Sequence, residues 1–191
     1  MGNQLDGHKV AILVTDGFEQ VELTEPMKAL KAEGAEVSVV SPKSGQIQGF
    51  QHHDKGDKVK VDLDLASARP DEFDALMLPG GVINPDALRL EPMAIAFVKH
   101  FVDSKKPIAA ICHGPWTLID AGGVKGRKVT SWPSLQTDLR NAGAQWSDEP
   151  VIVDQGLVTS RKPDDLPQFN AKMIEEFREG RHDKTHSTAA E

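Results

Sequence analysis

The 191-residue sequence contains a single cysteine, Cys112. One thiol excludes a disulfide framework within the chain and a zinc site built from several thiolates. We therefore expect no structural metal ion and no bound cofactor. A lone thiol also suits a reducing compartment, so we expect a cytoplasmic protein. Most single cysteines are small buried hydrophobic residues, so a functional role for Cys112 needs further evidence.

Long apolar runs and clusters of basic residues are lacking as well. No run of about 18 apolar residues occurs, so we expect no transmembrane segment. The formal net charge is −7, and the basic clusters are no larger than pairs such as Lys105–Lys106 and Arg127–Lys128. An acidic protein does not attract polyanions, so we expect neither nucleic acid nor a membrane to be the main partner.

Short apolar runs alternate with segments of helical periodicity along the chain. The runs predict strands at 10–14, 37–41, 73–78, 107–111, 128–131, 151–154 and 157–160, and the periodic segments predict helices at 19–32, 92–104, 114–121, 134–142 and 166–177. This alternation is typical of an α/β fold with a doubly wound, mostly parallel sheet and helices on both faces.

Three segments are less regular. Residues 44–57 predict a loop or an excursion hairpin, and the alternating residues 58–62 predict an exposed or edge strand. Pro26 suits a first helical turn better than an interior, which leaves the start of its helix open. We expect one domain over residues 1–179 and a disordered polar tail over 180–191.

Cys112 directly follows a predicted strand, and Gly114-Pro115 opens the next helix. This arrangement is typical of a nucleophile elbow, although Ala110 replaces the first glycine of that motif. The helix N-terminus favours a thiolate, and the backbone N–H of His113 is free to bind an oxyanion. Gly80-Gly81, at the end of a neighbouring strand, is the candidate for a second oxyanion donor.

His113 is the candidate base for Cys112, and a third group must then orient its imidazole ring. Asp86, which follows the Gly80-Gly81 loop, and Glu22 are the acidic candidates. Glu22 lies between Val21 and Leu23, an unfavourable place for an unpaired carboxylate.

Several motifs together resemble the PfpI-type intracellular protease and protein deglycase branch of the ThiJ/PfpI family. The motifs occur in the order FEQVEL, LPGG, PDALRL, ICHGP, GRKVTSW, NAGA and VTSRKPDDLP, and the resemblance covers roughly residues 9–178. The resemblance implies a class I glutamine-amidotransferase-like, flavodoxin-like sandwich with a Cys–His–acid site. It also implies a homo-oligomer, either a dimer or a hexamer.

By this resemblance Cys112 is the nucleophile and His113 is its base. Asp86 matches the family's third, acidic member, which the neighbouring subunit of a dimer donates, and some relatives have Glu there. Glu22 matches the glutamate that hydrogen-bonds the cysteine sulfur. Trp116 stands where close relatives often have Gln, so we expect it to reshape the substrate pocket.

A glutaminase, a metal-binding protein and a redox sensor are the alternatives to this stress-response hydrolase. A glutaminase needs a His-x-Glu motif downstream of the nucleophile, and beyond the adjacent His113 the only later histidines are His182 and His186. These two, and His52-His53, are expected to be solvated rather than metal-bound. A redox sensor or protective chaperone that uses an oxidisable Cys112 remains the alternative. The substrate remains open among peptides, glycated proteins and methylglyoxal.

Overall fold

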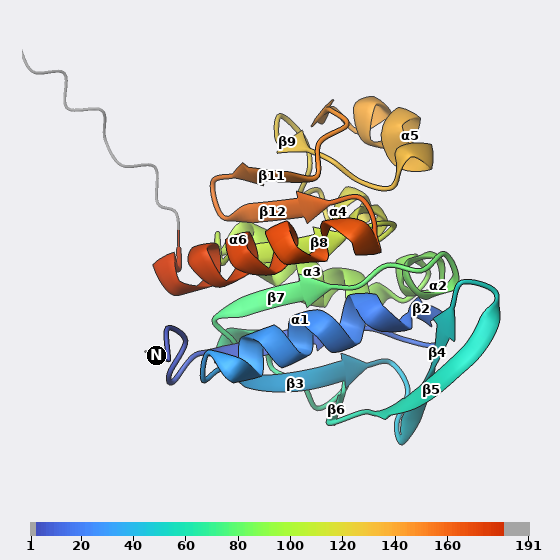
Figure 1. The fold of residues 1–191 in the computed structure, drawn as a ribbon, viewed down its shortest axis with the longest axis vertical. Coiled ribbons are helices and arrows are strands. Elements are labelled where there is room, and N and C mark those ends of the chain that lie inside the picture. Colours follow the sequence, from blue (N-terminus) through green and yellow to red (C-terminus); the bar gives the residue numbers. More distant parts are fainter. Residues whose placement is uncertain (1–2, 182–191) are drawn as a thin grey trace, which may run out of the picture.

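The computed structural model describes residues 3–181, so most of the predicted tail (182–191) lies outside the described residues. A seven-stranded sheet in the order β11-β12-β8-β7-β1-β3-β6 forms its centre (Figure 1). The strands are β1 (Lys9–Leu13), β3 (Glu36–Ser41), β6 (Leu63–Asp64), β7 (Ala75–Leu78), β8 (Ile108–Ile111), β11 (Val151–Asp154) and β12 (Leu157–Ser160). Neighbouring strands are parallel, except for the antiparallel pair β11 and β12. The predicted α/β fold is therefore confirmed.

Helices cover both faces of this sheet (Figure 1). One face carries α1 (Gln20–Ala32) and α6 (Leu166–Glu179), and the other carries α2 (Ile83–Arg89), α3 (Pro92–Asp103) and α4 (Pro115–Asp120). Because successive strand residues point to opposite faces, Ile12 belongs to the core beneath α1 and α6, and Leu13 to the core beneath α3 and α4. In residues 3–181 no helix is long and apolar enough to cross a bilayer.

Helix α1 begins at Gln20, and Pro26 lies inside it rather than in its first turn. A proline has no backbone N–H, so it cannot donate to the carbonyl of Glu22, four residues earlier. Burial of Leu23 and Leu30 against the sheet outweighs this lost hydrogen bond. Packing, rather than local propensity, therefore decides where this helix starts.

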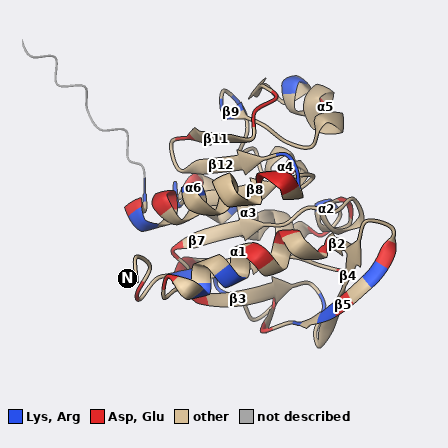
Figure 2. Ribbon diagram, in the orientation of Figure 1, with Lys and Arg blue, Asp and Glu red and all other residues tan. Residues whose placement is uncertain are grey.

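Two predicted strands lie outside the central sheet. Strand β5 (Asp54–Lys60) forms an antiparallel hairpin with β4 (Gln46–Gln51), which pairs in turn with β2 (Phe18–Glu19). The predicted edge strand at 58–62 is thus part of the excursion hairpin. Residues of both charge signs alternate along β5 (Figure 2), as suits a strand whose outer edge faces solvent.

Residues 128–131 were predicted to form one strand, and the structure differs there. Only β9 (Lys128–Val129) is a strand there, and it pairs with β10 (Gln145–Trp146) beside α5 (Gln136–Asn141). The chain leaves the central sheet at this point and returns at β11. Helix α2 was not predicted either, because its seven residues are too few for a clear helical period.

Asn84, in the first turn of α2, ties two strand ends together. Its side chain is fully buried. Its Nδ2 donates to the carbonyl oxygens of Pro79 and Gly80, each at 3.1 Å, and its Oδ1 accepts from the Thr15 N–H at 2.7 Å. The loops after β1 and β7 are therefore fixed relative to each other by one amide.

We predict that Asn84→Ala lowers the free energy of unfolding by about 1–3 kcal/mol, because it leaves buried backbone groups without partners. Asn84→Asp should cost more, because a carboxylate oxygen would then face two carbonyl oxygens. Urea denaturation measures both effects. The exposed Asn141, at the end of α5, provides the control, since Asn141→Ala should change stability by less than about 0.5 kcal/mol. Equal effects at both positions would contradict this role for Asn84.

Candidate active site

Cys112 occupies the sharp turn between β8 and α4. Its backbone is left-handed, with φ of 62°. The Cys112 N–H donates to the Ser160 carbonyl at 3.0 Å, and the Cys112 carbonyl accepts from the Trp132 N–H at 3.0 Å. A Cβ at Gly114 would lie 2.6 Å from the Leu78 carbonyl oxygen, so only glycine allows the turn to pack this closely. The strand–cysteine–helix layout expected from the sequence is present.

The Glu22 side chain lies beside this turn and is fully buried. Its Oε2 accepts from the Gly80 N–H at 3.0 Å, and its Oε1 is buried without a hydrogen-bond partner among residues 3–181. A Cβ on Gly80 would lie 2.4 Å from that oxygen and 2.6 Å from the Cys112 Cβ. Glycine at position 80 is therefore what allows the carboxyl group, the thiol and the loop after β7 to meet.

The Glu22 carboxyl and the Cys112 thiol are two acidic groups that lie in the same buried environment. Burial raises the pKa of the Glu22 carboxyl to about 8. Burial, together with the negative charge of Glu22, also raises the pKa of the Cys112 thiol. This direction is opposite to the one expected from the helix N-terminus. Backbone hydrogen bonds from Gly81 and His113 oppose the rise, so a Cys112 thiolate requires the proton to stay on Glu22.

His113 places its Nδ1 3.2 Å from the Cys112 Sγ. Its ring is buried, which lowers the pKa of the imidazole to about 4. It stacks on Trp132 with 6.0 Å between ring centroids and meets Trp116 edge-on at 5.1 Å. Among residues 3–181 no carboxylate hydrogen-bonds this ring, so His113 is neutral at pH 7 and can accept a proton.

The remaining predicted site residues take different positions. Asp86 is exposed on α2 and does not line the cavity above Cys112. Trp116 donates from Nε1 to Asp138 at 3.0 Å and lies beside His113 rather than in the cavity. The Gly80 N–H is occupied by Glu22, which leaves Gly81 and His113 as the backbone donors next to the sulfur.

A cavity of about 510 Å³ opens above Cys112. Its floor contains Glu22, Gly81, Cys112 and His113. Its walls come from segments far apart in the sequence, namely Gly17, Glu19, Phe50, His52, His53, Val82, Ile83, Trp132 and Pro163. His52 and His53, in the hairpin, were expected to be solvated. Both are exposed, and both also line the mouth of the cavity. No local pattern indicates that a hairpin tip reaches this far.

The parallel sheet and the cysteine on its elbow define a flavodoxin-like protein with a buried thiol site. The chain belongs to the DJ-1/PfpI family, whose model matches residues 8–176. "Deglycase TK1284" of Thermococcus kodakarensis is 46% identical over 170 residues, which are 89% of this chain and 99% of that protein. "General stress protein 18" of Bacillus subtilis is 43% identical over 170 residues, 88% of this chain and 96% of the relative. Drosophila melanogaster DJ-1beta superposes with a TM-score of 0.81 at 26% identity, covering 90% of each chain.

The raised pKa of Glu22 predicts a specific pH dependence of stability. Between about pH 5 and pH 8 the folded protein keeps a proton that the unfolded chain loses, so stability must fall as the pH rises. We expect Cys112→Ala to lose about 1.4 kcal/mol per pH unit relative to the double variant Cys112→Ala/Glu22→Gln. Denaturation of both variants across this range tests the prediction. Parallel stability curves would mean that Glu22 ionises normally.

Proposed function

We propose that the protein is a stress-response hydrolase in which Cys112 attacks a carbonyl carbon. The contact between the Cys112 Sγ and the His113 Nδ1, at 3.2 Å within a cavity, carries this proposal. A structural cysteine needs neither a neutral imidazole at hydrogen-bond distance nor two backbone N–H donors beside its sulfur. The names of the deglycase and stress-protein relatives support the same reaction class.

The reaction begins when the Cys112 thiol passes its proton to the neutral His113 Nδ1, 3.2 Å away, while Glu22 keeps its own proton. The sulfur forms a bond to the carbonyl carbon, and the carbonyl π pair moves to the oxygen, where the N–H groups of Gly81 and His113 can stabilise it. The oxyanion pair then re-forms the carbonyl, and the leaving group departs with its bonding pair and takes the proton from His113. Neutral His113 then accepts a proton from an attacking water, and the carbon–sulfur pair returns to Cys112.

The substrate is a peptide, a glycated protein or a small dicarbonyl such as methylglyoxal, since each offers a carbonyl carbon for attack. Methylglyoxal has no leaving group, so Cys112 would add to its aldehyde carbon, and a shift of hydrogen to the neighbouring carbonyl carbon would give the thioester that water hydrolyses. The relatives named deglycases favour a glycated substrate. We place the reaction in the cytosol, where a single free thiol stays reduced.

We predict that wild-type protein turns over at least one of three substrate types: methylglyoxal, a glycated amino acid or a short peptide. Cys112→Ser should retain less than about a hundredth of that rate, because a hydroxyl does not form the required anion. Circular dichroism would verify that the variant folds. If the wild type turns over none of them, and mild peroxide adds two oxygens to Cys112, the redox-sensor alternative holds instead.

We further propose that a second copy of the chain completes the site. Among residues 3–181 no acidic side chain is a partner of His113, and a nearby carboxylate would raise its lowered pKa and stabilise its protonated form. Asp86 is the candidate donor. It lies among large apolar side chains that the single chain leaves exposed, at 55% for Val82, 56% for Ile83 and 82% for Leu90. Such a patch is typical of an association surface.

Mixed dimers test this arrangement. The homodimers of Cys112→Ala and of Asp86→Ala should both be nearly inactive, whereas each mixed dimer would contain one complete site. Random exchange makes about half of the dimers mixed, so the blend should recover about a quarter of wild-type activity. Native mass spectrometry would verify the exchange. If the subunits exchange and no activity returns, Asp86 does not act across the interface.

A further inference from the structure

The cavity above Cys112 is larger than a small dicarbonyl substrate requires. Its volume is about 510 Å³. Methylglyoxal needs little more than the volume of a few water molecules, at about 30 Å³ each. Large apolar groups form two of its walls: Phe50 comes from the β4–β5 hairpin, and Trp132 and Pro163 come from the loops after β9 and β12. The space beside the reacting sulfur is therefore apolar and aromatic.

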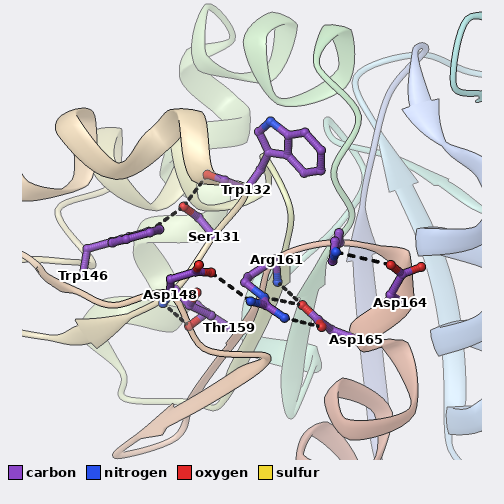
Figure 3. Close-up of polar contacts among 10 residues, drawn as sticks. Ser131, Trp132, Trp146, Asp148, Thr159, Arg161, Asp164 and Asp165 are labelled. Carbon is purple, nitrogen blue, oxygen red and sulfur yellow. Dashed lines mark hydrogen bonds and ion pairs between the residues drawn. The ribbon is translucent and has the colours of Figure 1, made fainter.

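Hydrogen bonds hold the Trp132 wall in place (Figure 3). The Ser131 Oγ donates to the Trp132 carbonyl at 2.8 Å, and the Trp146 Nε1 donates to the same Ser131 oxygen at 2.9 Å. The Trp132 ring stacks on His113 at an interplanar angle of 23°. It is nevertheless 39% exposed, so it is held beside the catalytic groups with much of its surface uncovered.

Charged groups fix the chain on either side of Pro163 (Figure 3). Arg161 pairs with Asp165 at 3.0 Å and with Asp148 at 2.9 Å. The opposite wall is anchored where the His52 N–H donates to the Glu19 carboxylate at 3.1 Å. Both walls are thus positioned before any ligand arrives, which reduces the entropy that binding would cost.

We propose that this pocket recognises a large apolar group, preferably aromatic, attached to the carbonyl carbon that Cys112 attacks. Phe50 and Trp132 are the specificity-determining residues, since both face the cavity from fixed backbone. This inference rests on the proposed function and deepens it by naming the substrate class: acyl or dicarbonyl compounds with a bulky apolar substituent, in preference to methylglyoxal.

Alkylation of Cys112 tests the pocket without requiring turnover. Iodoacetamide and iodoacetanilide have the same reactive carbon, but only the second has a phenyl ring. We expect the ratio of their rate constants at Cys112, divided by the same ratio for N-acetylcysteine, to be about 10 or more, because the ring becomes buried. Trp132→Ala and Phe50→Ala should each lower this ratio at least threefold. Val153→Ala, which removes an exposed side chain outside the cavity, should leave it unchanged.

The outcomes separate this inference from the proposed function. A wild-type ratio near 1, or a raised ratio that survives in both Trp132→Ala and Phe50→Ala, overturns the apolar pocket even if methylglyoxal is turned over. A raised ratio that falls in the two variants supports the pocket even if no substrate is turned over, in which case hydrolysis alone fails. Trp132→Phe, which keeps an aromatic ring, should retain most of the ratio and guards against misfolding of the alanine variant.

Discussion

A carboxyl group buried against a thiol is the constraint on which the rest of the site depends. Glu22 can be buried there only because the Gly80 N–H donates to it and because position 80 has no Cβ. The loop after β7 must then approach Cys112 closely, and Asn84 holds that loop to the end of β1. The position of the proton on this acid pair decides whether the sulfur carries a charge. The cost of burying Glu22 is therefore linked directly to reactivity.

Much of the central sheet could be predicted because each buried strand is a continuous apolar run. The predicted strands at 151–154 and 157–160 agree with β11 and β12 at both ends. The prediction failed at 128–131, where only Lys128–Val129 is a strand and pairs with β10 outside the central sheet. Helix α2 was missed because seven residues show no clear helical period. The exposed edge strand predicted near 58–62 is present as β5, the outer strand of the small sheet β2-β4-β5.

The residues of the candidate site also fall into those that the sequence predicts and those that it does not. Cys112, His113 and Gly81 were identified because a strand end followed by glycines is a local signal. The wall residue Phe50 was not, because it reaches the site only after the hairpin folds over the strand ends. The direction of the Cys112 pKa was wrongly predicted because the helix N-terminus is visible in the sequence, whereas burial beside Glu22 is not. The acidic partner of His113 remains a prediction.

The left-handed backbone at Cys112 also restricts how this lineage can diverge. Glycine adopts that conformation freely, asparagine and aspartate tolerate it, and β-branched residues do not. A descendant that abandons the chemistry but keeps the fold should therefore drift to glycine, asparagine or aspartate at this position, and not to valine, isoleucine or threonine. The backbone of the turn would then persist after the nucleophile is lost. Inactive family members should be recognisable by glycine, asparagine or aspartate at an otherwise unchanged turn.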